Sequence, residues 1–173
     1  LLHKFFETLN SFEKPVIALV HGKSMGGALG LIACCDIVIA ESQAQFCFSE
    51  VKLGLIPATI APYVVRKIGF SQARHFFLTA EMLGAHTAKA IGLVHHVCDQ
   101  NDFSAKKQEV VEHINKNSPA AMNHVKTLLE CVAPIDEKLG KTTAKMLADI
   151  RVSKEAQEGL KAFLEKRLPS WVR

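Results

Sequence analysis

Two adjacent glycines, Gly26 and Gly27, stand where a short apolar segment turns into a helical pattern. The first backbone N–H groups of a helix have no partner within it, and glycine lets a ligand oxygen come close to them. Such a turn can stabilise negative charge that develops on an oxygen during a reaction. The pattern is neither a dinucleotide-binding glycine motif nor a phosphate-binding loop. The alternative is that the two glycines only allow tight packing.

A carboxylate would be needed beside this turn for general acid/base chemistry. Glu50 is one candidate, because the predicted strand at residues 45–48 delivers it into a loop. The residue pattern alone does not separate Glu50 from Glu41 or Glu81, and most glutamates near strand ends are simply solvated.

Hydrophobic patterning predicts the elements that would position these groups, and it predicts an α/β fold. Strands are expected at residues 16–20, 36–40, 45–48 and 93–97. Helices are expected between them at residues 1–12, 25–35, 62–69, 72–80 and 87–91. Beyond about residue 99 the pattern is helical only, with helices at 103–116, 119–132, 135–150 and 155–167. Two parts are therefore expected, residues 1–99 and residues 100–173.

Composition narrows the classes of function. The chain has 173 residues, 49% of them apolar, which is ample for a core, and its net charge of +4 does not demand nucleic acid. Neither its five cysteines nor its eight histidines show a metal-ligand spacing, so we expect no metal and buried thiols in a reducing compartment. No apolar run is long enough to cross a membrane. Because the first residue is Leu1, we expect a processed chain or a piece of a longer one.

The order of residues in GKSMGGALGLIACCDIVIA, followed by FCFSEVKLGLIPATIAPYVV, resembles the enoyl-CoA hydratase/isomerase (crotonase) family. The resemblance continues to AQEGLKAFLEKRLPSW at residues 156–171, and the sequence is most similar to those of bacterial methylglutaconyl-CoA hydratases. It implies a crotonase-type spiral of ββα units. Residues 1–99 would be the C-terminal portion of the spiral core and residues 100–173 a helical trimerisation region. The N-terminal part of the fold, which supplies the second oxyanion N–H, has no counterpart in this chain.

The resemblance also implies roles for single residues. Gly27, with Gly26 beside it, would provide one N–H for the thioester oxygen, and Glu50 would be the acid/base. Ala58 takes the place of a residue whose N–H helps to hold the attacking water. Phe163 and Lys166 of the last helix would reach the CoA group, often that of a neighbouring subunit.

One departure from the family pattern leaves the reaction open. Many hydratases carry a glutamate three residues after the oxyanion glycine, where this chain has Gly30. Glu50 alone could support hydration or a shift of the double bond. The expected function is an enoyl-CoA hydratase, acting on 3-methylglutaconyl-CoA in leucine degradation. The alternatives are a Δ3,Δ2-enoyl-CoA isomerase and a truncated, non-catalytic acyl-CoA binding or assembly protein.

Partners and compartment follow from the same resemblance. No cofactor is expected, since coenzyme A is part of the substrate. The chain would bind an acyl-CoA and copies of itself, as a homotrimer or a dimer of trimers, and neither nucleic acid nor a membrane. The expected compartment is the bacterial cytoplasm, or the mitochondrial matrix in a eukaryote.

Overall fold

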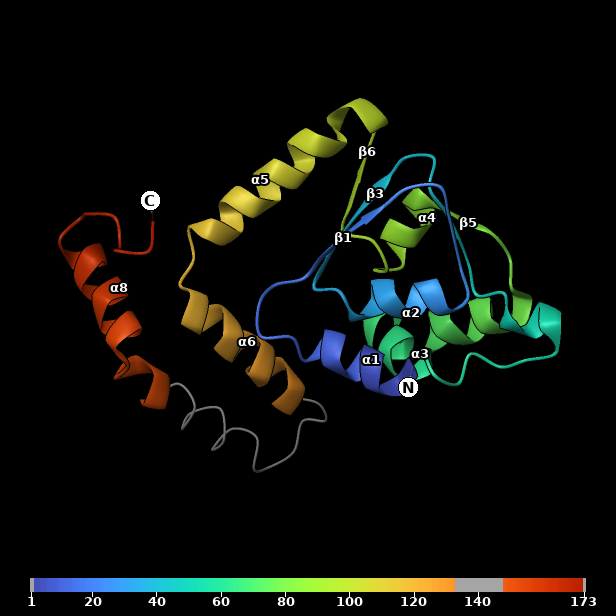
Figure 1. Ribbon diagram of the computed structural model, residues 1–173, viewed down its shortest axis with the longest axis horizontal. Coiled ribbons are helices and arrows are strands. Elements are labelled where there is room, and N and C mark those ends of the chain that lie inside the picture. Colours follow the sequence, from blue (N-terminus) through green and yellow to red (C-terminus); the bar gives the residue numbers. More distant parts are fainter. Residues whose placement is uncertain (1, 133–147, 173) are drawn as a thin grey trace. The chain divides into compact units, whose positions relative to one another are not determined.

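The structure is a computed structural model that describes residues 2–132 and 148–172 (Figure 1). The chain divides into two compact units, Leu1–Glu109 and Val110–Arg173. The division falls within helix α5 (Phe103–Asn115), whereas the sequence pattern places the change to helix-only structure near residue 99.

The first unit contains a parallel sheet of three strands in the order β1-β3-β6. These are β1 (Ile17–Val20), β3 (Ile37–Glu41) and β6 (His96–Cys98). The central strand β3 is apolar along its middle, and its residues 38–40 are fully buried. Continuous apolar residues are typical of a parallel strand that is covered on both faces.

A second sheet has the order β2-β4-β5, built from β2 (Lys23–Met25), β4 (Gln45–Cys47) and β5 (Leu83–Gly84). Strand β4 pairs with β2 in parallel and with β5 in antiparallel fashion. The sequence did not predict β2 or β5, because strands of three and two residues are too short to show a period. Since β2 takes up residues 23–25, the helix predicted at 25–35 begins later, as α2 (Gly27–Cys34).

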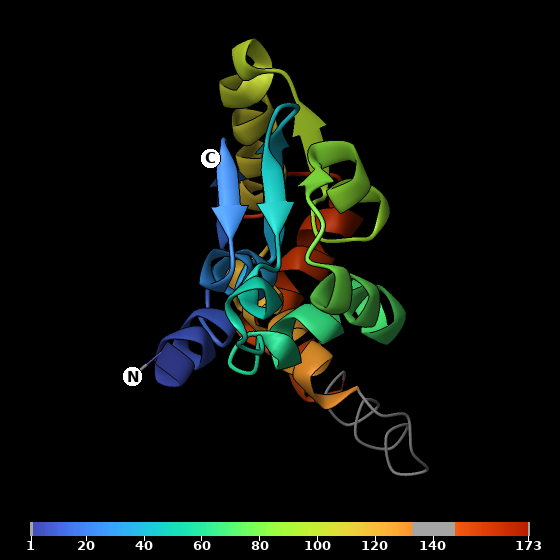
Figure 2. The same cartoon turned by 90° about the vertical axis from the view of Figure 1, so that its right-hand side faces the viewer.

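Three helices of the first unit lie together, α1 (Leu2–Asn10), α2 and α3 (Ala61–Thr79), as both views show (Figures 1 and 2). Helix α3 is interrupted at Gly69, whose φ is 78°, so it corresponds to the two helices predicted at 62–69 and 72–80. The short helix α4 (Ala85–Ala90) follows. The strand predicted at 93–97 begins only at His96, because the N–H groups of Leu93 and Val94 donate to the Ala88 carbonyl.

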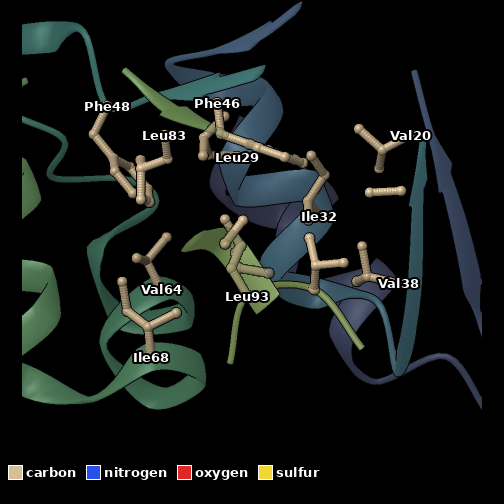
Figure 3. Close-up of a cluster of buried hydrophobic side chains, with 14 of the residues drawn as sticks. Val20, Leu29, Ile32, Val38, Phe46, Phe48, Val64, Ile68, Leu83 and Leu93 are labelled. Carbon is tan, nitrogen blue, oxygen red and sulfur yellow. The ribbon is translucent and has the colours of Figure 1, made fainter. Parts of the chain in front are cut away.

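The core of this unit surrounds α2 (Figure 3). Leu29 and Ile32 of α2 lie among side chains from the strands and from α3, where Val64 and Ile68 are labelled. Helix α2 is apolar around its whole circumference, which is typical of a buried helix. The core packing therefore fixes where the first turn of α2 stands.

The regular secondary structure described in the second unit is helical. Helix α6 (Pro119–Cys131) begins as predicted, with Ser118 as N-cap accepting from the Ala121 N–H at 3.1 Å. Helix α8 (Lys154–Leu164) is capped in the same way by Ser153. The helix predicted at 135–150 lies largely outside the described residues, and the one predicted at 155–167 ends at Leu164. Among the described helices, we find none with the length and apolar character needed to cross a bilayer.

Candidate active site

The turn between β2 and α2 has a backbone conformation that favours glycine. Gly26 has φ of 52° and ψ of −123°, and its N–H donates to the Cys47 carbonyl in β4 at 3.0 Å. Gly27 is the first residue of α2 and is exposed, and apart from its chain neighbours and the backbone of α2 no described atom lies within 4 Å of the position that a Cβ would take there. The first N–H groups of a helix have no partner inside it. The start of α2 is therefore accessible to a ligand oxygen.

Glu50 lies directly beside this turn. It begins a short 3-10 helix (Glu50–Leu53) where the sequence predicted a loop, and its carbonyl accepts from the Leu55 N–H at 3.1 Å. A Cβ on Gly26 would stand 3.5 Å from Glu50 Oε1 and 3.6 Å from Ser49 Oγ. The Glu50 carboxylate thus lies at van der Waals distance from the Gly26 Cβ position, next to the start of α2.

One oxygen of this carboxylate has no protein partner. Glu50 Oε2 is buried and accepts no hydrogen bond from any described residue. Buried polar atoms are nearly always satisfied, so an exception marks a place where water or a ligand is expected. The other two candidate glutamates differ, because Glu81 pairs with His75 at 2.6 Å and Glu41 is a ladder residue of β3 opposite Cys98.

The position of Gly30 is filled by apolar side chains. A Cβ built there would collide with Ile60 Cγ2 and stand 2.9 Å from Phe6 Cζ. Both residues are buried, Phe6 completely and Ile60 at 2% exposure. A second carboxylate at this position does not fit the packing as it stands. The sequence indicated only that the side chain is missing, since the contacts come from residues far away along the chain.

Ala58 is exposed, and its N–H donates to the Ile56 carbonyl at 2.8 Å. This N–H is therefore engaged within its own turn in the present arrangement. Its role in holding water stays a prediction.

Phe163 and Lys166 belong to the second unit. Phe163 lies near the end of α8 and is 80% exposed, and Lys166 is exposed directly beyond that helix. The Lys166 N–H donates to the Phe163 carbonyl at 3.2 Å, with φ of 54° at Lys166. Both side chains are accessible, and contact with CoA stays a prediction. Gly26, Gly27 and Glu50 are the predicted site residues that the structure brings together.

A lysine that sequence reasoning missed holds the other end of α2. Lys67 Nζ donates to the carbonyl of Cys35, the C-cap of α2, at 2.5 Å. Burial lowers the pKa of Lys67, and it raises the pKa of the Cys34 thiol to about 11 with help from Cys35. A cation at the C-terminal end of a helix is favourable. A lysine on a half-buried helix gives no sequence signal of such a long-range contact.

The His95 side chain also has a structural explanation. His95 Nδ1 accepts from the Val38 N–H at 2.8 Å, and burial lowers the pKa of His95. Within the described part of the chain, no group of three or more His, Cys, Asp or Glu could hold a metal ion.

Known proteins are similar to this chain in sequence and in architecture. The family model described as enoyl-CoA hydratase/isomerase matches residues 2–173. The chain is 47% identical to a solved enoyl-CoA hydratase from Shewanella pealeana, with a TM-score of 0.93 over 98% of this chain and 64% of that one. An enoyl-CoA hydratase/isomerase from Marinobacter aquaeolei has a TM-score of 0.92 at 34% identity, over 99% of this chain and 66% of that one.

A mitochondrial enoyl-CoA hydratase from Pongo abelii is 34% identical over 169 residues, which are 95% of this chain and 57% of that protein. The chain thus spans about two thirds or less of the length of these relatives. The neighbours confirm the predicted α/β crotonase-type fold, of which this chain carries a part. The chain belongs to the enoyl-CoA hydratase/isomerase family.

Proposed function

We propose that this chain carries the acid/base and one oxyanion donor of an enoyl-CoA hydratase. One observation carries the proposal: the Glu50 carboxylate lies beside the glycine turn that starts α2, with a buried oxygen that has no partner among the described residues. Family membership and the hydratase names of the relatives support it.

The residues would divide the reaction as follows. The Gly27 N–H donates to the thioester oxygen as that oxygen gains enolate charge. Glu50 takes a proton from the water that attacks the β carbon, and the same carboxyl returns a proton to the α carbon. Removing one oxyanion donor costs about 3 kcal/mol of transition-state stabilisation, so a second donor beside Gly27 would add a rate factor of roughly a hundred or more.

The substrate and assembly belong to the same proposal. The acyl group is 3-methylglutaconyl, an assignment that rests on the likeness of GGALGLIACCD and SEVKLGLIPATIAP to methylglutaconyl-CoA hydratases. Phe163 and Lys166 would contact the CoA portion, and the chain would assemble as a trimer or a dimer of trimers. The apolar residues that α8 exposes, among them Phe163 and Leu164, support an interface between subunits.

The experiment follows the loss of the conjugated enoyl-thioester absorbance with 3-methylglutaconyl-CoA and, for comparison, crotonyl-CoA. Glu50→Gln should lower kcat at least about 100-fold with little change in affinity for CoA thioesters. Glu81→Gln is the matched control, because Glu81 is exposed and its carboxylate pairs with His75. Turnover that survives in Glu50→Gln would contradict the assignment.

A Δ3,Δ2-enoyl-CoA isomerase is the second candidate, and two contacts favour it. Ile60 and Phe6 occupy the place of a second carboxylate at Gly30, and the Ala58 N–H is engaged with Ile56. Of the two groups that would share the water with Glu50, the carboxylate is thereby absent and the N–H is engaged elsewhere. Conversion of a 3-enoyl-CoA to its 2-enoyl isomer, with no oxygen taken up from labelled water, would favour this reading over hydration.

A non-catalytic acyl-CoA binding or assembly protein is the remaining alternative, because the chain spans about two thirds of its solved relatives. The assay is therefore run on this chain alone and on this chain joined to the preceding segment of the Shewanella pealeana relative. Tight binding of CoA thioesters without turnover in both forms would favour the non-catalytic alternative.

A further inference from the structure

Glu50 lies beside the N-cap of α2, and Ile60 lies beside the first turn of that helix. Gly26 is the N-cap of α2, with a non-helical φ of 52° and ψ of −123°, whereas Gly30 is the fourth residue of the helix. Glu50 Oε1 occupies the space beside Gly26, and the Ile60 side chain occupies the space beside Gly30. The start of α2 therefore has the Glu50 carboxylate beside its N-cap and an apolar side chain beside its first turn.

Ile60 is held firmly in this position. It lies just before α3, its N–H donates to the Pro57 carbonyl at 3.2 Å, and the side chain is 2% exposed. The Phe6 ring lies on the same spot beside Gly30, and it packs against Tyr63 with ring centroids 5.8 Å apart. Neither side chain can move aside without disturbing the core, since close-packed interiors transmit small changes of volume.

We infer that Ile60, supported by Phe6, is a specificity-determining residue that keeps Glu50 the single acid/base of the site. Its hydrocarbon side chain occupies the space beside Gly30 and leaves no room there for a second carboxylate. The inference rests on the proposed function for its catalytic consequence, whereas the packing on which it depends can be tested by itself.

The packing is tested first, by thermal unfolding. Gly30→Ala should lower Tm by about 4 °C or more, because the added methyl group overpacks the contact with Ile60. In an Ile60→Ala background the same Gly30→Ala change should lower Tm by less, because Phe6 is then the remaining close neighbour. Ile68→Ala is the matched background. Ile68 is a buried isoleucine of α3, and none of its atoms is among the three nearest to the Cβ position of Gly30. There Gly30→Ala should cost as much as in the wild type.

The catalytic consequence is tested by rescue of the Glu50→Gln variant. Glu50→Gln combined with Gly30→Glu and Ile60→Ala should recover at least tenfold in turnover over Glu50→Gln alone, because a second carboxylate now has room. The combination with Ile68→Ala in place of Ile60→Ala should recover nothing. If the glutamate variant does not fold by circular dichroism, aspartate at position 30 serves the same test.

Three results would overturn the inference. The first is an equal cost of Gly30→Ala in the wild-type and Ile60→Ala backgrounds. The second is rescue by Gly30→Glu while Ile60 is intact. The third is a folded triple variant without rescue. If the wild type itself shows no Glu50-dependent turnover, the proposed function fails, and the two Tm comparisons still decide whether Ile60 fills the position beside Gly30.

Discussion

The two units of this chain bury their apolar residues very differently. In the first unit a continuous cluster of buried side chains surrounds α2 and includes Phe6, Leu29 and Phe46, all at 0% exposure. Among the described residues of the second unit, the buried hydrophobic side chains are those of Val110 and Ala162. The second unit instead exposes large apolar side chains, at positions 125, 129, 152, 160, 163, 164 and 168.

The first unit is held by its buried core, whereas the helices of the second unit depend more on capping. The candidate site is built where burial is complete, because a turn and a carboxylate can be held in register only by elements that are themselves fixed. The helices of the second unit satisfy their ends by capping and leave much of their apolar surface uncovered. The first unit should therefore respond to mutation of its core, and the second unit to changes in caps, surface bonds and association.

Truncating one phenylalanine in each unit gives the largest expected contrast. Phe6→Ala should lower the free energy of unfolding by about 3–5 kcal/mol, because it removes a fully buried ring. Phe163→Ala removes a ring that is 80% exposed and should change the unfolding free energy of the unassembled chain by no more than about 0.5 kcal/mol. Denaturant unfolding at low protein concentration measures both free-energy changes. A loss at Phe163 as large as that at Phe6 would contradict the contrast between the units.

Substitution of the two glycines of the turn by alanine should lower the free energy of unfolding by different amounts. Gly26→Ala should destabilise the chain by about 1–3 kcal/mol, since φ is 52° and ψ −123° there and the new methyl group would touch Glu50 and Ser49. Gly27→Ala, in open space at the first position of α2, should cost less than about 0.5 kcal/mol of stability. Equal losses of unfolding free energy would show that the turn is not held as described.

Much of the first unit could be predicted from the sequence, and the exceptions share one cause. The apolar runs that became β1, β3 and β4 and the helix-stopping Gly69 are local signals, and they were interpreted correctly. Strand β5 has two residues and depends on pairing with β4, which no local pattern reveals.

The candidate site followed the same division. The glycine turn was visible as a local signal, whereas Glu50 was preferred to Glu41 and Glu81 only through the family resemblance. The contacts of Ile60 with Gly30 and of Lys67 with Cys35 join segments that are far apart along the chain. Such contacts depend on the finished packing, so they could not be read from spacing.

Removing a helix cap should have a moderate effect confined to the second unit. Ser153→Ala should cost about 1 kcal/mol of helix stability, because Ser153 Oγ accepts from the Ala156 N–H at 3.2 Å. Amide hydrogen exchange at Ala156 measures this loss directly. Ser153→Thr keeps an oxygen in place and serves as the control. Unchanged protection of the Ala156 amide in Ser153→Ala would mean that the cap does not hold the start of α8.

The smallest expected effect concerns the chain end after α8. Glu158 of α8 accepts several hydrogen bonds from this segment. Its carboxylate accepts from Arg167 at 2.7 and 2.9 Å and from the Ser170 N–H at 3.0 Å. The Trp171 ring lies against Gly159, with one ring carbon 3.0 Å from the position of a Cβ there. Trp171 is the single tryptophan of the sequence, so its fluorescence reports on this segment.

The hydrogen bonds from Arg167, followed by the one from Ser170, lower the pKa of Glu158 from 4.5 to about 2. A carboxyl with a lowered pKa in the folded state stabilises that state fully above its unfolded pKa, and loses this contribution as the pH falls through its folded pKa. The Trp171 emission should therefore stay constant above about pH 5 and shift between about pH 4.5 and pH 2. Added salt should weaken the effect, since these charges are exposed.

Glu158→Gln should show the shifted Trp171 emission already at pH 7, because its side chain cannot form the charged bonds to Arg167. Glu13→Gln changes the net charge by the same amount in the first unit and should keep the wild-type profile. Identical pH profiles for the wild type and Glu158→Gln would show that Glu158 does not hold the segment. The second unit would then owe the order of its chain end to the Trp171 ring and its bond to the Lys116 carbonyl at 3.3 Å.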